Sequence, residues 1–256
     1  MTALWIRLFV ALLLAHLLAD FILQSNTIAQ KKEKWYWLGL HSLVHGLLTY
    51  ALLAAWKLWW LPLVILGSHF LIDWVKTHLK RNPVWIFVLD QIFHVAILIA
   101  LASFAQSSGA ETPFWLAWMP TLTYPIAVVG CALILLLPCG GILIGLLTEP
   151  FQKQLESNYK KKQQEKDVSN KAVQIKGFDN GGRIIGYLER LLILVFILAN
   201  QYAGIGFLVA AKSIFRFGEL KENENRMEAE YIIIGTFASF LYAIVIGLGA
   251  AWLISL

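Results

Sequence analysis

Charged residues are scarce in this chain. Asp, Glu, Lys and Arg make up only 14% of its 256 residues, whereas 59% are hydrophobic. An ordinary soluble domain carries about a quarter charged residues, and the mean hydropathy here is +0.66. The composition excludes an ordinary soluble domain and indicates an integral membrane protein.

Three other absences narrow the chemistry. The two cysteines, Cys131 and Cys139, lie in one apolar run, which argues against a disulfide framework or a thiolate zinc site. The stretch GFDNGGR at 177–183 has no strand or Walker pattern around it, which argues against a phosphate loop. None of the six histidines has a histidine neighbour, which argues against a membrane di-iron oxidase.

Long apolar runs are what the chain has in abundance. A spanning helix needs about 20 mostly apolar residues, and seven runs qualify: roughly 3–23, 38–59, 62–79, 84–105, 114–147, 184–215 and 231–254. The first lacks the features of a cleaved secretory signal. The fifth contains three prolines and predicts a kinked span, and NQYAGIG in the sixth predicts a turn. The fold class expected is an all-α, polytopic transmembrane helical bundle of seven to eight spans.

Basic residues alternate between the links that join these runs. QKKEKW and KTHLKRNP are rich in Lys and Arg, whereas KLWWLP and AQSSGAETP contain a single Lys. Because cytoplasmic loops collect basic residues, we expect the first loop inside and the N-terminus outside, in a bacterial inner membrane. This topology accounts for the net charge of +5, and no nucleic-acid partner is expected.

The expected organisation has four parts. Residues 1–110 form a four-helix membrane domain with a His/Asp site, and 111–149 form the kinked span. Residues 150–182 form a polar cytoplasmic loop or surface helix, and 183–256 form a membrane hairpin and the last span.

Four histidine or aspartate pairs occur at a spacing of four residues on successive apolar runs: His16/Asp20, His41/His45, His69/Asp73 and Asp90/His94. On a helix this spacing places both side chains on one face, about 5–6 Å apart at Cβ. The topology puts all eight within about 15 Å of the cytoplasmic face at 1.5 Å rise per residue. They predict one shared polar site. The alternative is hydrogen bonding that merely joins helices.

Nitrogen and carboxylate ligands without thiolates favour zinc, with manganese or iron as alternatives. Tetrahedral zinc takes four ligands, so eight candidates predict two or three ions, or one ion pair with carboxylates that orient imidazoles. Paired ions support phosphoester hydrolysis, with catalytic roles expected for Asp20, Asp73, Asp90 and Lys76. Lys76 could instead be a snorkelling interfacial lysine. Gln24 and Gln91 are candidate hydrogen-bond donors to the carboxylates.

The C-terminal part carries a second polar set. Lys212 and Arg216 lie four residues apart, and recognition of an anionic lipid headgroup is one interpretation. Ion pairing and interfacial anchoring, with Glu189, Arg190 and Glu230 nearby, are the other.

The motifs HLLADFILQ, HSLVHG, HFLIDWVK and DQIFH, in this order, resemble an uncharacterised family of bacterial integral membrane proteins, a domain of unknown function, over residues 10–100. IGYLERLLI and AAKSIFRF resemble a C-terminal extension of some members. A looser similarity is to the LexA-regulated membrane-bound metal-dependent hydrolases and to the helical zinc phospholipase C group. That group uses HxxxD pairs, matched here by His16/Asp20 and His69/Asp73, and its N-terminal tryptophan ligand is absent.

The function favoured by these patterns is a membrane-embedded metal-dependent hydrolase that acts on a phospholipid or other phosphoester at the cytoplasmic leaflet. Membrane lipids are its expected partners. A transporter for metal ions or small solutes is the second hypothesis, but a transport pathway would spread ligands through the membrane depth. A structural or partner-binding membrane protein is the remaining alternative.

The topology can be tested by labelling. We expect a cysteine placed at Lys161, in a chain whose native cysteines are replaced by alanine, to resist membrane-impermeant thiol reagents in intact cells, because its basic loop faces the cytoplasm. Labelling of this cysteine from the periplasm would reverse the topology and move the site to the other leaflet.

Overall fold

The protein is mostly helical in the part that the structure, a computed structural model, describes: residues 2–79, 83–165, 180–217 and 226–256. These residues contain no strand, so the expected all-α class is confirmed. The chain divides into two compact units. The first comprises Met1–Pro138 and Trp252–Leu256, and the second comprises Cys139–Ala251.

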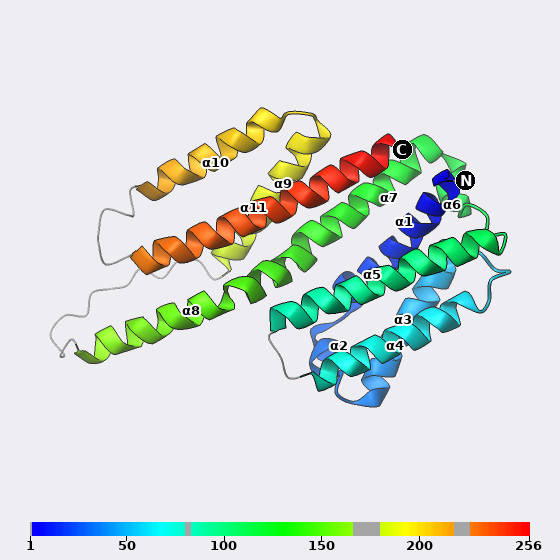
Figure 1. Ribbon diagram of the computed structural model, residues 1–256, viewed down its shortest axis with the longest axis horizontal. Helices are drawn as coiled ribbons and strands as arrows, with labels where there is room; N and C mark the ends of the chain where they lie inside the picture. Colours follow the sequence, from blue (N-terminus) through cyan, green and yellow to red (C-terminus); the bar gives the residue numbers. More distant parts are fainter. Residues whose placement is uncertain (1, 80–82, 166–179, 218–225) are drawn as a thin grey trace. The chain divides into compact units, whose positions relative to one another are not determined.

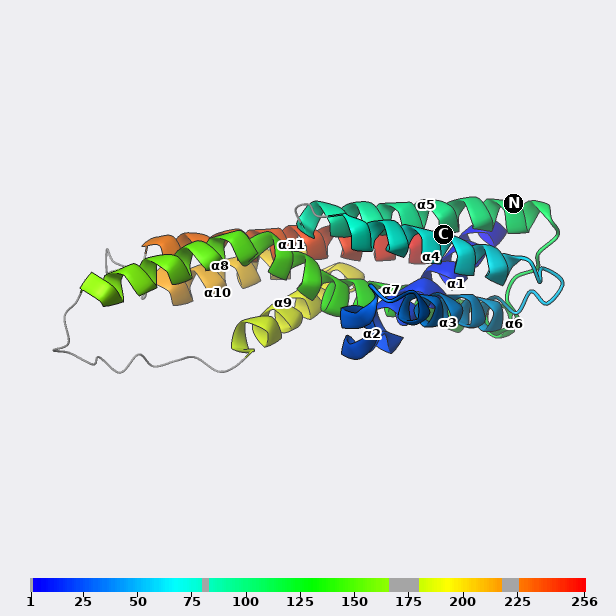
Figure 2. The same cartoon turned by 90° about the horizontal axis from the view of Figure 1, so that it is seen from below.

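Four helices of the first unit form a closed ring. They are α1 (Thr2–Leu18), α3 (Trp35–Leu53), α4 (Leu61–His78) and α5 (Pro83–Ser107). Each contacts the next in this order, and α5 contacts α1 again (Figures 1 and 2). The short α2 (Asn26–Lys31) precedes α3, α6 (Phe114–Trp118) follows α5, and α7 (Pro120–Ile134) packs against α1. The ring therefore has an interior that all four helices face.

The ends of these helices follow from local sequence. Ser25 caps α2 by accepting the N–H of Ile28, as a serine at this position commonly does. Ala54, with φ of 50°, ends α3 in the left-handed conformation. Pro62 lies in the first turn of α4 and Pro83 begins α5, where a missing N–H costs nothing.

The described residues include two π-helical turns, one at the end of a helix and one within a helix. The first, η1 (Ala19–Leu23), continues α1 and contains Asp20. The second, η2 (Leu135–Cys139), joins α7 to α8 (Gly140–Glu165) and contains Pro138. Proline cannot donate the helical hydrogen bond, so the irregularity falls where the sequence predicts a kink. The helix does not stop where the apolar run ends, because α8 continues into the polar segment.

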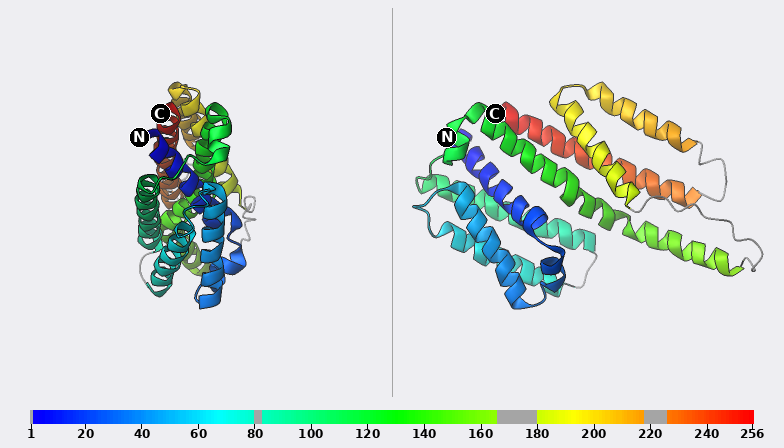
Figure 3. Two further views of the ribbon diagram at one scale, coloured as in Figure 1. Left: turned by 90° about the vertical axis from the view of Figure 1, so that its right-hand side faces the viewer. Right: turned by 180° about the vertical axis from the view of Figure 1, so that it is seen from behind.

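The second unit contains α8, α9 (Gly181–Leu198), α10 (Tyr202–Phe217) and most of α11 (Arg226–Ser255). Helices α9 and α10 pack together (Figure 3). Between them Asn200 adopts a left-handed φ of 56°, inside the NQYAGIG stretch that predicts a turn. The structure thus splits the long apolar run 184–215 into two helices.

Within the described residues, four helices are long and apolar enough to cross a membrane: Leu4–Leu23, Pro83–Ser107, Pro120–Tyr159 and Ala229–Ser255. Many large apolar side chains are exposed on the helices, among them Leu47, Leu63, Leu71 and Phe93. Soluble monomers rarely expose wide apolar surfaces. These two features indicate a membrane protein.

Helices α3 and α4 approach closely at Gly46. A Cβ at this position would lie 3.0 Å from the carbonyl oxygen of Pro62 and 3.5 Å from Cβ of Leu66. Gly39 is on the same helix, but a Cβ there would meet nothing within 4 Å. Of these two glycines, Gly46 is therefore the one that the close packing of α3 and α4 requires. These two helices carry four of the eight candidate ligands.

This difference gives a matched test of the ring. We expect Gly46→Leu to destabilise the protein by about 1–3 kcal/mol, because overpacking forces the helices apart. Gly39→Leu should leave stability unchanged or slightly raised, since leucine is the better helix former. Thermal unfolding in detergent measures both, and equal midpoints for the two variants would contradict the close approach.

Candidate metal centre

All eight predicted ligand residues face the interior of the four-helix ring. Each of the four helices, with η1 as the continuation of α1, contributes one pair, and the spacing of four residues puts both members on the inner face. Seven of the eight are at most 4% exposed: His16, His41, His45, His69, Asp73, Asp90 and His94. The Asp20 side chain is 9% exposed. The structure thus brings together pairs that lie far apart in sequence.

The centre of the cluster is Oδ1 of Asp20. The Nε2 atoms of His41, His45 and His69 lie 3.0, 3.2 and 3.6 Å from it. Ligand atoms around a tetrahedral zinc with bonds of about 2.0–2.1 Å are about 3.3 Å apart. One carboxylate and three imidazoles therefore have the composition and the spacing of a four-ligand metal site, and their ligand atoms all lie within 4.8 Å of one another.

A second group consists of His69, Asp73 and His94, also with ligand atoms within 4.8 Å of one another. It shares His69 with the first group, and one nitrogen atom cannot ligate two ions at once. Among the described residues, the group around Asp20 alone offers four separate ligands. The geometry therefore favours one complete centre, with a second ion dependent on the other nitrogen of His69.

The tautomer of His94 leaves a lone pair directed at the cluster. Its Nδ1 lies 2.8 Å from the backbone carbonyl of Asp90, and a carbonyl only accepts, so Nδ1 carries the proton. Nε2 is then an acceptor, and it is buried without a hydrogen-bond partner among the described residues. A metal-ligating histidine characteristically donates its other N–H to a carbonyl or carboxylate in this way.

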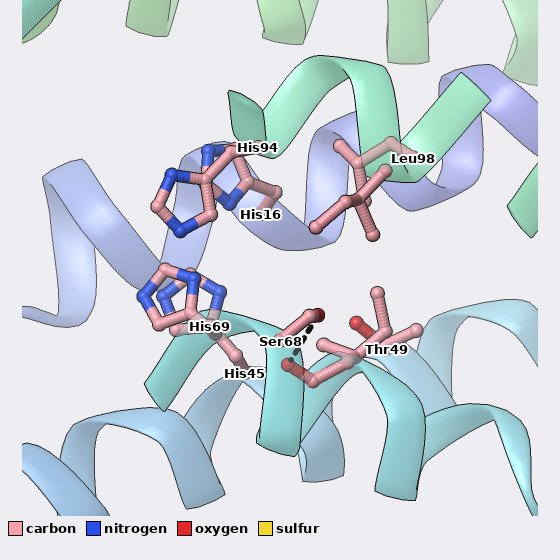
Figure 4. A pocket seen from close by; sticks show the side chains of 9 residues that line it. His16, His45, Thr49, Ser68, His69, His94 and Leu98 are labelled. Atoms are coloured by element: carbon pink, nitrogen blue, oxygen red, sulfur yellow. Dashed lines mark hydrogen bonds between the residues drawn. The ribbon is translucent and has the colours of Figure 1, made fainter. Parts of the chain in front are cut away.

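Nε2 of His16 and Nε2 of His69 are likewise buried without a hydrogen-bond partner in the described part of the chain. Together with His45 and His94, these two rings line a cavity of about 10 Å³, enough for about one water-sized particle. Figure 4 shows the four imidazoles on one side of this cavity and Thr49 and Ser68 on the other. The cavity offers nitrogen acceptors to a small cation.

Two lysines hold the other carboxylates. Lys32 Nζ lies 2.6 Å from Oδ2 of Asp73, and Lys76 Nζ lies 2.6 Å from Oδ2 of Asp90. Gln91 also donates to Asp90, over 3.1 Å. Lys76 is thus more than a membrane-surface anchor. Lys32 is a residue that the sequence reasoning missed, because the basic loop QKKEKW is already explained by topology.

Asp20 has no Lys or Arg partner within the described ranges. Its neighbours are imidazoles and the amide of Gln91, 3.4 Å from Oδ2. With neutral imidazoles, three carboxylates against two ammonium groups leave the cluster one negative charge. A buried charge is costly unless it is paired, and a divalent cation beside Asp20 would supply the missing partner.

Four further residues are candidates from the sequence: His78, Gln24, Lys212 and Arg216. His78 is exposed, and its ring meets Trp74 on its own helix. Gln24 makes no hydrogen bond to the three carboxylates among the described residues. Lys212 forms an ion pair with Glu189 at 2.7 Å. Arg216 belongs to α10, but its side chain lies outside the described residues.

Residues 8–123 match the family model described as "Protein of unknown function (DUF3307)". This match confirms the resemblance to an uncharacterised family, and it includes all eight candidate ligands. No curated protein and no solved structure matches the chain.

The site predicts tightly bound metal. We expect the protein purified without chelator to contain a divalent transition metal, and His45→Ala to lose most of it because one of four ligands is gone. His78→Ala is the matched control, since His78 is exposed and outside the cluster. Elemental analysis measures the content.

A second readout covers the case in which His45→Ala fails to fold. A ligand that binds only the folded state stabilises it, so a chelator should lower the unfolding temperature of the unaltered protein. Equal metal in both variants, or a protein indifferent to chelator, would contradict the site.

Proposed function

We propose that this chain, whose residues 8–123 match the model of a family of unknown function, is a membrane-embedded metal-dependent hydrolase. Its substrate class is a phospholipid or other phosphoester, taken from the cytoplasmic leaflet of a bacterial inner membrane. Zinc is the preferred ion, and manganese and iron are alternatives with the same ligand preference. The observation that carries the proposal is the group of Asp20, His41, His45 and His69 beside two carboxylates that lysines hold in place.

The ion would be held by Asp20 and the three imidazoles around its Oδ1. An ion held there would have to take a fifth ligand to act catalytically, and it would then polarise a phosphoryl oxygen or lower the pKa of a bound water molecule. Asp73 Oδ2 lies 3.7 Å from Nε2 of both His41 and His69. A carboxylate so placed can accept the proton that a water molecule loses on attack. Asp73 is accordingly the proposed general base.

The lysines are suited to meet the phosphate group. Lys32 and Lys76 are the cations that the described residues bring to the cluster, and each is bound to a carboxylate by a single oxygen. An anionic substrate can share these ammonium groups, which then offset the charge on its phosphoryl oxygens. Asp90 holds Lys76 in position until that happens.

A path to the cluster begins at the same lysines. The exposed fraction of the side chain rises from 9% at Asp20 to 12% at Lys32 and 32% at Lys76. Lys76 is in the last turn of α4 and Lys32 follows α2 directly, so both belong to the basic links expected in the cytoplasm. This gradient supports entry of water and headgroup from that side.

The proposed topology has seven to eight spans. The four long apolar helices account for four of them. Helices α3, α4 and α9 have 19, 18 and 18 residues, close to the minimum of about 17 for a span, and α10 has 16. Counting all four gives eight.

Transport of a metal ion is less well supported. A transport pathway needs successive ligands along the membrane depth, whereas four of the eight residues line one small cavity and three imidazoles surround one carboxylate oxygen. Access of the same ligands from both sides of the membrane would favour transport instead.

The catalytic role of Asp73 gives the decisive test. We expect Asp73→Asn to abolish release of phosphate or headgroup from a bacterial lipid extract, because asparagine cannot accept the proton. Metal content should persist, since the four ligands around Asp20 remain, and the unfolding temperature should change little. Glu111→Gln is the control, since it also removes one carboxylate but is exposed and far from the cluster in sequence.

Three outcomes separate the interpretations. Lost turnover with metal and fold retained supports the hydrolase. Full turnover would remove Asp73 from the reaction. Loss of metal and unfolding together would make the ion structural and leave the hydrolase without support.

A further inference from the structure

The second unit contains a large cavity that the proposed hydrolase does not use. Its volume is about 550 Å³, within the range of about 300–1,000 Å³ typical of small-molecule sites. Residues from α8, α9, α10 and α11 line it, and all of them belong to the second unit.

The lining carries an excess of positive charge. Arg183, Arg190 and Lys212 line the cavity, and Glu189 is the single carboxylate among the described residues that line it. Glu189 is bound to Lys212, with its two oxygens 2.7 and 2.8 Å from Nζ. The cavity therefore has two net positive charges and complements an anion.

Arg190 is fixed so that its guanidinium borders this cavity. It is 3% exposed, and Nη1 donates to the hydroxyl of Ser239 on α11 over 2.9 Å. Gly186, one turn earlier, makes room for it, because a Cβ there would lie 3.2 Å from Nη1. A guanidinium is the side chain best suited to bidentate binding of phosphate.

The rest of the lining is apolar or small. Ile144, Ile185 and Ile232 are among the lining residues, and the volume exceeds what a phosphate group alone would fill. Two of the helices that line it, α8 and α11, belong to candidate membrane spans. These features favour a ligand with an apolar body attached to its anionic group.

Two glycines keep the space open instead of serving helix packing. Glycines in membrane helices commonly allow helices to approach, but a Cβ at Gly145 or Gly182 would meet nothing within 4 Å. Both line the cavity. A larger side chain at Gly145 would thus enter the cavity without displacing a neighbour.

We propose that this cavity binds a phosphate-bearing anion, with Arg190 and Lys212 facing the phosphate and the isoleucines facing the apolar body of an anionic lipid. The site is separate from the metal centre, and its existence does not depend on the hydrolase. The same phosphate chemistry could come from a soluble phosphate, and the experiment distinguishes the two sources.

The test measures lipid retained by the full-length protein in detergent, by native mass spectrometry. The delipidated protein is incubated with dioleoyl phosphatidylglycerol or dioleoyl phosphatidylcholine, each with and without millimolar inorganic phosphate. Gly145→Leu fills the cavity, and Arg190→Gln removes its buried cation. Gly206→Leu is the matched control, because Gly206 is on α10, has open space around it and does not line the cavity.

The unaltered protein and Gly206→Leu should retain phosphatidylglycerol in preference to phosphatidylcholine. Arg190→Gln should retain roughly tenfold less, the factor expected for loss of a charge-assisted hydrogen bond, and Gly145→Leu should also retain less because its side chain fills the cavity. Gly145→Leu keeps the test valid if Arg190→Gln fails to fold. Displacement of phosphatidylglycerol by inorganic phosphate, in the unaltered protein alone, would assign the site to a soluble anion. Equal retention of both lipids, or of phosphatidylglycerol by all four proteins, would overturn the proposal.

Discussion

The burial of three carboxylates inside an apolar helical ring is the constraint to which the rest of the first unit responds. An ion taken out of water costs several kcal/mol unless it is paired, and hydrocarbon offers no partner. Asp73 and Asp90 are each matched by a lysine at 2.6 Å. Asp20 has only imidazoles and an amide among the described residues. The ring is electrostatically incomplete at this one residue.

A hydrogen-bonded polar core is the plainest alternative to a metal centre, and it accounts for fewer of the contacts. An oxygen of a carboxylate has about two lone pairs, yet three imidazole nitrogens lie within 3.6 Å of Oδ1 of Asp20. Buried polar atoms normally have partners, and Nε2 of His16, His69 and His94 have none in the described part of the chain. A cation in the group around Asp20 would give Nε2 of His69 a partner, and one in the group of His69, Asp73 and His94 would do the same for Nε2 of His94.

The sequence predicts the cluster because its signal is local and repeated. Each pair, such as His69 and Asp73, lies on one face of its own helix, and short links put the pairs at one level. The turn near Asn200 is predicted for the same reason, since its residue types act locally. Lys32 is different: it meets Asp73 across 41 positions, and a loop rich in lysine already has an explanation. The π-helical turn that contains Asp20 includes no proline, so the sequence does not predict it.

Both units contain a lysine–carboxylate pair, but the charge that remains beside the pair has opposite sign in the two sites. In each, a carboxylate on a helix is held by a lysine from another segment: Asp73 by Lys32, which follows α2, in the first unit, and Glu189 by Lys212 of α10 in the second. What remains after this pairing sets the ligand that each can take. Around Asp20 the remaining charge is negative, and the groups without a partner are nitrogen lone pairs, which suit a metal cation. In the cavity beside Arg190 the lining residues sum to a positive charge, which suits a phosphate. Lysine–carboxylate pairs thus cancel part of the charge at each site, and the charge of the other described residues favours a cation beside Asp20 and an anion in the cavity.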